Sequence, residues 1–213
     1  MKILFFDLET TGTDFRVHAI HQMAIMIVKD GKVMEQLSYN MKPFDGALVD
    51  DLALAVAGVT KEQIYEYPDD QQVFLSFRAL LNRYIDKFNK QDKFFLAGYN
   101  NSAFDNAFLR KWFENCGEKY FGSYFWSNSL DIMSLATQHL IKVRATMPDF
   151  KLKTVAITLN IQIDESKLHD AGYDVWLTYQ IYCAVINDQH KGLWATDRID
   201  LIPVEYQDTF FQL

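Results

Sequence analysis

The order of apolar and polar positions along the 213-residue chain predicts a mixed β-sheet flanked by helices. The run at residues 3–6 (ILFF) is typical of a buried strand, because it is apolar on both faces. Two later strands are joined through Asp30-Gly31, a dipeptide that favours a tight hairpin. Strands are predicted at residues 2–8, 19–29, 32–42, 94–99 and 126–131.

Five other segments are predicted to be helical, and residues 103–116 show the clearest apolar stripe. The predicted helices are 71–88, 103–116, 131–142, 151–159 and 171–188. In the first of them, the aromatic side chains are expected to pack in the core; they are Phe74, Phe77, Tyr84 and Phe88. Three meandering strands followed by alternating strands and helices predict an α/β fold with a mixed sheet of about five strands.

The first group of candidate functional residues follows the N-terminal strand. It comprises Asp7, Leu8, Glu9, Thr10, Thr11 and Gly12. Residues two apart in a strand face the same way, so Asp7 and Glu9 present adjacent carboxylates while Leu8 points into the core. Gly12 carries no Cβ and lets the backbone approach a ligand closely. By itself, this pattern is equally consistent with solvated surface charge.

A second group lies where the helix after the fourth predicted strand begins, in residues 101–105 (NSAFD). Its candidate residues are Asn101, Phe104 and Asp105, and Asp105 falls in the first turn of the helix. By itself, this arrangement is better explained as helix capping, because an acid at a helix N-terminus interacts favourably with the helix dipole.

A third group opens the last predicted helix. Asp170 is expected to cap that helix, and the largely apolar run after it makes Asp174 an acid in a buried helix. His169 lies in the preceding connection, where its side chain can move between water and a pocket. A lone histidine is more often structural than catalytic, but this one lies five residues before an acid with no evident partner.

In this order, the three groups resemble the motifs of DnaQ-like 3′–5′ exonucleases of the DEDDh type. That family includes the proofreading subunit of bacterial replicative DNA polymerase. The matching patterns are Asp-x-Glu-Thr-Thr-Gly, Asn-x-x-Phe-Asp, and a histidine five residues before an aspartate. The resemblance covers about residues 2–188 and implies a ribonuclease H-like fold. One departure is Ala57-Gly58-Val59, where relatives often have His-Gly-Ile in the segment that lines the terminal-nucleotide pocket.

The resemblance also implies a site with two divalent cations, Mg²⁺ with Mn²⁺ able to substitute, which would activate water and stabilise the departing oxygen. Asp7 would bridge the cations. Glu9 and Asp174 would bind on the side of the nucleophile, and Asp105 on the side of the leaving group. His169 would be the general base for the attacking water. The residues expected to bind substrate are Leu8, Thr10, Thr11, Gly12, Asn101 and Phe104.

Composition and charge narrow the class of protein. With 49% hydrophobic residues the chain can build a large core, and no apolar stretch is long enough to span a bilayer. The net charge of −7 disfavours a protein that grips long duplexes, but it permits one that takes a few nucleotides of a single-stranded end. Cys116 and Cys183 lack metal-ligand spacing, and free thiols fit the reducing cytoplasm, which is the predicted location.

We expect one exonuclease domain over residues 1–190 and a C-terminal tail over residues 191–213 that packs on it. Residues 207–211 (QDTFF) faintly resemble peptides that bind bacterial sliding clamps, so a clamp or a DNA polymerase is a candidate partner. The favoured function is a 3′–5′ exonuclease on single-stranded DNA ends. Two alternatives remain open: an exoribonuclease that acts on RNA 3′ ends, and a non-catalytic module that binds nucleic acid or a polymerase.

Overall fold

The structure is a computed structural model, and it describes residues 1–189 and 211–212. A six-stranded sheet forms its centre, in the order β5-β4-β1-β2-β3-β6. The strands are β1 (Lys2–Thr10), β2 (Ile20–Lys29), β3 (Lys32–Asn40), β4 (Phe95–Gly98), β5 (Leu130–Asp131) and β6 (Phe211–Gln212). The first three form an antiparallel meander, and β4 joins β1 in parallel, so β1 lies near the middle of the sheet.

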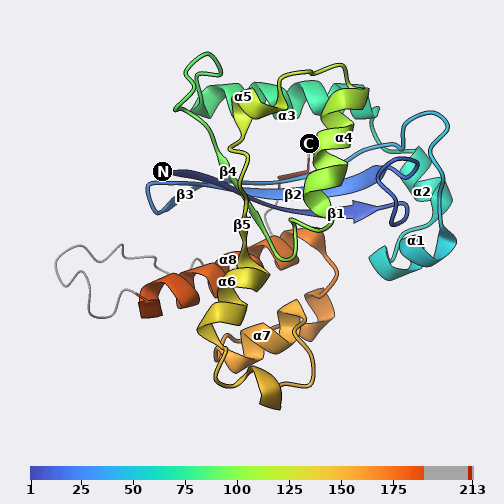
Figure 1. Cartoon of the computed structure of the whole chain (residues 1–213). Helices are drawn as coiled ribbons and strands as arrows, with labels where there is room; N and C mark the ends of the chain where they lie inside the picture. The colour runs from blue at the N-terminus through green and yellow to red at the C-terminus, as the bar shows by residue number, and fades with distance from the viewer. Residues whose placement is uncertain (190–210, 213) are drawn as a thin grey trace.

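Helices cover both faces of this sheet, as Figure 1 shows. One face carries α3 (Asp70–Tyr84), α4 (Asp105–Asn115) and α5 (Phe121–Tyr124). The other carries α6 (Ile132–His139), α7 (Leu152–Thr158) and α8 (Ala171–Gln189). Two short helices, α1 (Asp51–Ala57) and α2 (Lys61–Tyr65), lie near the carboxyl end of β1, and two 3₁₀ turns span Arg144–Thr146 and Glu165–Lys167. The predicted α/β class, with a mixed sheet flanked by helices, is confirmed.

The alternation of side chains along β1 divides the core into two clusters. Leu4, Phe6 and Leu8 pack with the residues of α3 and α4, whereas Ile3 and Phe5 pack with those of α6 and α8. A strand that is apolar on both faces is typical of the centre of a covered sheet. β1 is therefore held from both faces along the run that leads to its carboxyl end.

Aromatic contacts fix α3 against α4. Phe74 and Phe77 are buried as predicted, and the rings of Phe74 and Phe113 lie 4.9 Å apart between centroids in an edge-to-face arrangement. Phe77 stacks on Trp112 at 5.9 Å. Such pairs add about 0.5–1.5 kcal/mol each to the stabilisation that burial gives. They hold α4, whose first residue is Asp105, in a fixed position over the sheet.

The helix predicted over residues 71–88 ends earlier, at Tyr84, because Ile85 is extended. The prediction that Phe88 packs in the core is wrong, since its side chain is 87% exposed. The cause is local. The Asp86 carboxylate accepts a hydrogen bond from the Phe88 N–H at 3.0 Å, and this turn competes with continuation of the helix.

Other element boundaries differ less. The hairpin at Asp30-Gly31 is confirmed, and both residues have positive φ (50° and 79°), as a type I′ turn requires. α1 and α2 were not predicted, and the strand expected at residues 126–131 is regular only at Leu130–Asp131. None of the helices in the described part is both long and apolar enough to cross a membrane.

Most of the expected C-terminal tail, residues 190–210 and 213, lies outside the described residues. Its residues Phe211 and Gln212 pair with Leu37 and Ser38 of β3 in parallel. The division into a domain over residues 1–190 and a packed tail stays a prediction.

Candidate active site

Asp7 and Glu9 lie at the carboxyl end of β1, the central strand. They pair in register with Ala24 and Gln22 of β2, and both are half-buried. Leu8, between them, is 6% exposed and packs in the core, as the alternation predicts. The two carboxylates therefore share one face of β1 at the point where it leaves its covering helices.

Asp105 reaches the same end of the sheet through β4 and the turn that follows it. At Gly98, the last residue of β4, a Cβ would lie 2.7 Å from the Asn101 Cβ and 3.0 Å from the Phe6 carbonyl oxygen. Glycine is therefore needed for the chain to turn this close to β1. Asp105 is the first residue of α4 and is 7% exposed, and its carboxylate is hydrogen-bonded by the backbone of Leu8.

Asp174 comes from the first turn of α8, which packs against β1 from the other face. The carboxylate of Asp170 accepts a hydrogen bond from the Tyr173 N–H at 2.9 Å, which confirms Asp170 as the cap of this helix. His169 sits before the cap with φ of 70°, and its backbone is hydrogen-bonded to the Asp174 carboxylate. The His169 side chain itself is exposed.

The four carboxylates share one electrostatic environment. Burial first, and then the charges of Asp105 and Asp174, raise the pKa of Asp7 well above its ordinary range. Burial and the same two charges raise the pKa of Glu9 to about 7. The pKa values of Asp105 and Asp174 also rise to about 7, chiefly because of burial. Because Coulomb repulsion weakens with distance, these shared effects place the side chains from β1, α4 and α8 in one cluster.

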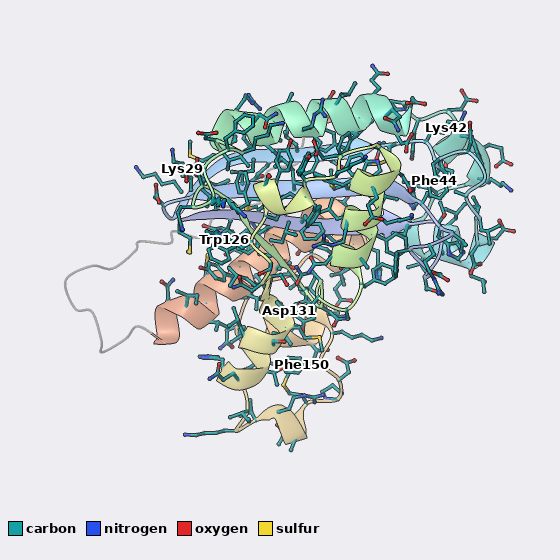
Figure 2. All side chains as sticks on the ribbon, turned by 45° about the horizontal axis from the view of Figure 1, so that its top comes forward. Lys29, Lys42, Phe44, Trp126, Asp131 and Phe150 are labelled. Carbon is teal, nitrogen blue, oxygen red and sulfur yellow. The ribbon has the colours of Figure 1, made fainter. Side chains whose placement is uncertain are left out.

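Asp131 borders this cluster, although the sequence analysis gave it no role. It caps α6 and raises the pKa of Asp105, and it lies centrally in Figure 2. Its two carboxylate oxygens accept hydrogen bonds from the backbone N–H groups of Asn100 and Ser102, at 3.2 and 3.4 Å. Asp131 therefore braces the turn that leads to Asp105. An acid between a strand end and a helix start is the signal that could have identified it.

The threonines expected to bind substrate are engaged within the protein. The Thr10 hydroxyl donates to the Gly12 carbonyl at 2.7 Å. The Thr11 hydroxyl donates to the Leu48 carbonyl at 2.7 Å and accepts from the Ala19 N–H at 2.9 Å. Both hydroxyls therefore shape the turn after β1.

Asn101 and Phe104 lie in the turn before α4. The Asn101 side-chain amide is fully buried and donates to Asn106 Oδ1 at 3.2 Å, while its own Oδ1 accepts no hydrogen bond from a described residue. The Phe104 ring packs on Phe108 with a centroid distance of 4.8 Å and stays partly exposed. Asn101 thus stabilises the turn, and Phe104 offers an aromatic surface next to Asp105.

The donor set fits hard divalent cations, which prefer carboxylate oxygens. Asp174 Oδ1 is buried and has no hydrogen-bond partner among the described residues, so it is available to a ligand. In the described part of the chain, no three acidic, histidine or cysteine side chains stand close enough together to enclose a metal ion. To bind a metal ion, the carboxylate side chains would have to rotate towards one another, against their mutual repulsion.

Comparison with known proteins finds relatives of this chain. A family model described as "RNase_T: Exonuclease" matches residues 4–182. Ribonuclease T of Hahella chejuensis (strain KCTC 2396) is 26% identical over 204 residues, which cover 91% of this chain and 88% of that protein. Ribonuclease T of Shewanella sp. (strain MR-4) is 25% identical over 198 residues, covering 88% of this chain and 83% of that protein.

Among solved structures, E. coli Exonuclease I in complex with a dT13 oligonucleotide superposes with a TM-score of 0.65 and 22% identity over 87% of this chain. The zinc-bound form of the E. coli Exonuclease I–single-stranded DNA complex gives a TM-score of 0.67 at 22% identity over 91% of this chain. This chain covers only 40% and 42% of those two chains. The superposition confirms the ribonuclease H-like fold expected from the sequence.

Proposed function

Because the chain belongs to the exonuclease family, we propose that it removes nucleotides from single-stranded 3′ ends by metal-dependent hydrolysis. Membership confirms the prediction that the chain is an enzyme, a 3′–5′ exonuclease that hydrolyses phosphodiester bonds. The resemblance drawn from the sequence holds at the level of this family, whose named relatives are Ribonuclease T and Exonuclease I. A special likeness to the polymerase proofreading subunit is not part of the proposal.

The observation that carries the proposal is the convergence of four acids from three elements, described above. Isolated carboxylates on a protein surface ionise readily, whereas burial raises the pKa values of Glu9, Asp105 and Asp174 to about 7, and the charges of Asp105 and Asp174 add to the rise in the pKa values of Asp7 and Glu9. A fold that holds buried like charges together needs a compensating ligand. Nucleases of this family use divalent metal ions, and we propose two of them, Mg²⁺ with Mn²⁺ able to substitute.

We assign Asp7, at the centre of the cluster, as the ligand shared by both cations. Glu9 and Asp174 would bind on the nucleophile side and Asp105 on the leaving-group side. Bound there, divalent cations supply charge neutralisation for the phosphodiester and a lower pKa for the attacking water. The exposed imidazole of His169, whose backbone is hydrogen-bonded to the Asp174 carboxylate, would take the proton that this water releases.

Substrate contacts divide into two kinds. Phe104, with a partly exposed ring, would contact the terminal nucleotide, and Gly12 would let the backbone approach it. Leu8, whose side chain packs in the core, would contact it through its backbone. Thr10 and Thr11 would act indirectly, because their hydroxyls are already engaged in the turn. Asn101 would hold the Asp105 turn in place.

Single-stranded DNA is the substrate favoured from the sequence, and RNA is the second candidate. What favours RNA is that the curated relatives aligned over most of their length are named Ribonuclease T. The 2′-hydroxyl is the chemical difference that a site would have to read. A direct test compares DNA and RNA oligonucleotides of one sequence, labelled at the 3′ end, with Mg²⁺ present.

The same assay tests the proposal as a whole. Asp7→Ala removes the shared ligand and should abolish release of the labelled nucleotide, whereas Glu66→Gln removes an exposed carboxylate elsewhere and should not. Equal background hydrolysis by the wild type and Asp7→Ala would favour a non-catalytic binding module instead. Preferential turnover of RNA would replace DNA with RNA as the substrate.

A sliding clamp or DNA polymerase stays a candidate partner. Of residues 207–211, which suggested it, only Phe211 lies within the described part of the chain. Deleting the last eight residues should abolish binding to a clamp in a pull-down assay. No binding by the intact protein would end this idea without affecting the proposed nuclease chemistry.

A further inference from the structure

Phe88 is 87% exposed, more than any other large apolar side chain that the structure describes. It lies in the loop of residues 85–94 between α3 and β4, here called the basic loop. An aromatic ring left in water forgoes roughly 1.5–3 kcal/mol of burial. Its exposure, together with the lysines beside it, makes Phe88 a candidate contact for a ligand.

The basic loop holds Phe88 in a defined position. Asp86 accepts from the Phe88 N–H at 3.0 Å, and the Asn89 N–H donates to the Asp86 carbonyl at 2.9 Å. The carboxylate of Asp92 accepts from the Asp86 N–H at 2.9 Å and is paired with Lys2 of β1. The loop is thus tied to itself and to the sheet, so a ligand would meet Phe88 on an already ordered surface.

Basic side chains surround Phe88. Lys87, Lys90 and Lys93 belong to the basic loop, and none makes an ion pair with a described residue. The Lys87 ammonium lies 5.6 Å from the centre of the Phe88 ring, and Lys93 lies 5.4 Å from that of Trp126. The basic loop also contains Asp86 and Asp92, but Asp92 is paired with Lys2 of β1, so the three lysines leave a local positive charge in a chain whose net charge is −7.

Two more lysines extend this surface from the neighbouring strands. Lys29 and Lys32 face each other across the β2–β3 hairpin, and Lys29 also pairs in register with Lys2 of β1. Neither makes an ion pair with a residue that the structure describes, and Lys29 lowers the pKa of Asp92 in the basic loop. The lysines therefore gather at the amino end of β1, where Figure 2 places Lys29 and Trp126 on the same side.

The segment of residues 126–131, which bends at Ser127 and Asn128, connects this end of the sheet with the candidate active site. Residues 126–131 start at Trp126, beside Lys93, and end at Asp131, beside Asp105. Both ends are labelled in Figure 2. Ser127, Asn128 and Ser129 between them are small and polar, whereas Leu130 packs against the core, and the Ser129 hydroxyl lies 3.1 Å from both Ser102 Oγ and Asn106 Nδ2. At about 3.3 Å per residue the segment would span at most roughly 17 Å.

We propose that the basic loop, with Lys29 and Lys32, is a second contact surface for the single-stranded substrate, reached along residues 126–131. The exposed face of Phe88 stacks on a base, and the lysines contact phosphates, a combination typical of sequence-independent single-strand binding. A single strand can stretch beyond the roughly 3.4 Å per nucleotide of a duplex strand, so it reaches this surface at most about five nucleotides before the cleaved end. The inference rests on the proposed nuclease function.

The competing occupant is an acidic protein. Phe88 between lysines suits either ligand, but only a strand whose end lies in the active site must also pass residues 126–131. A nucleic acid therefore explains both the position and the chemistry of the surface. A dependence on substrate length distinguishes the two.

The experiment compares the wild type with a Phe88→Ala/Lys90→Gln variant on oligonucleotides of about two and about twenty nucleotides. A Tyr120→Ala/Lys119→Gln variant is the control, because Tyr120 is 71% exposed beside an exposed lysine outside this surface. The Phe88→Ala/Lys90→Gln variant should have a KM for the long oligonucleotide that is roughly fivefold higher or more, with an unchanged kcat. Its KM and kcat for the short oligonucleotide should equal those of the wild type. Phe88→Leu, which keeps an apolar side chain, should also raise that KM.

Equal constants for variant and wild type on the long substrate would overturn the proposal and favour a protein partner. An equal increase in KM for the long and the short oligonucleotide would also overturn the proposal, because a distant contact cannot affect a strand that is too short to reach it. If the wild type degrades neither substrate, the proposed function has failed. The surface is then tested by the affinity of the long oligonucleotide for Asp7→Ala protein with and without Phe88→Ala, and equal affinities would overturn it.

Discussion

Replacing Asp174 by Asn should stabilise the protein at pH 8 in the presence of a chelator, although it removes a proposed metal ligand. Asparagine keeps the shape of the side chain and removes a charge that burial and Asp170 disfavour. The carboxylates of Asp7 and Glu9 are also stabilised in their ionised forms, because one source of repulsion disappears. Active-site acids commonly reduce stability in this way.

The magnitude follows from the pKa of Asp174, which rises from 3.8 to about 7. A group whose pKa is raised by folding contributes most below its unfolded value. As pH rises from about 4 to 7, the unfolded chain ionises first and the folded state loses stability relative to it. Roughly three pKa units at 1.36 kcal/mol each give an upper limit of about 4 kcal/mol. Relaxation of neighbouring side chains reduces this, so we expect about 1–3 kcal/mol.

Urea unfolding at pH 8 and at pH 4, each with EDTA, measures the effect. The free energy of unfolding of Asp174→Asn should exceed that of the wild type at pH 8, and the difference should shrink at pH 4. Asp164→Asn is the control: the pKa of that exposed acid is lowered by hydrogen bonds from Ser166, so its replacement should not stabilise. Adding Mg²⁺ should then stabilise the wild type more than Asp174→Asn, because only the intact cluster binds it well. A variant no more stable than the wild type at pH 8, or a difference independent of pH, would refute the reasoning.

Three further predictions concern residues around the cluster. His21 is buried, neither ring nitrogen has a hydrogen-bond partner among the described residues, and burial lowers its pKa to about 4. Between pH 6.5 and 4 the imidazole binds a proton in the unfolded chain but not in the folded one, so the free energy of unfolding decreases as the pH is lowered. His21→Leu should remove about 3 kcal/mol of this decrease, measured by urea unfolding at pH 6.5 and at pH 4. Gly98→Ala should destabilise by about 1–3 kcal/mol and slow hydrolysis, because its Cβ would meet Asn101 and the Phe6 carbonyl; an unchanged melting temperature would contradict the tight turn. Asp131→Ala should lower the free energy of unfolding by about 1 kcal/mol, because the cap of α6 is lost, and should slow hydrolysis. Asp131→Asn should retain most of the stability, and equal melting temperatures of the two variants in calorimetry would argue against the cap.

The local pattern of the sequence was sufficient to place each candidate acid on its element. The alternation around Asp7 and Glu9, the helix start at Asp105 and the cap at Asp170 are all found in the structure. Each depends on neighbours within a few residues, which the sequence displays directly. The hairpin after β2 belongs to the same class of local signal.

The convergence of the acids could not be derived from local pattern, because it depends on contacts between distant segments. β4 pairs in parallel with β1, Leu4 beside Leu96, and this register delivers Asp105 to the end of β1. α8 packs on the opposite face and delivers Asp174. The cluster was expected only from the family resemblance, and the roles of its members stay predictions.

Phe88 illustrates why helix periodicity alone failed at the end of α3. Phe77, Tyr84 and Phe88 continue a helical spacing, yet Asp86 captures the Phe88 N–H and Asn89 captures the Gln91 N–H. Short polar side chains that bond to their own backbone compete with a helix, and here the competition decides the chain direction. The same feature turned an expected core residue into the most exposed aromatic side chain described.

The way the fold holds the cluster determines what can relieve its repulsion. β1 is packed on both faces, and the backbone of Leu8 is hydrogen-bonded to Asp105, so the acids cannot move apart with their backbones. The repulsion can then be relieved only by protons or by cations on the carboxylate oxygens. With pKa values near 7 for Glu9 and Asp174, protons occupy these oxygens until the solution is about neutral. Protons and divalent cations therefore compete for the same atoms, and the affinity for the cations should increase as the pH rises through 7.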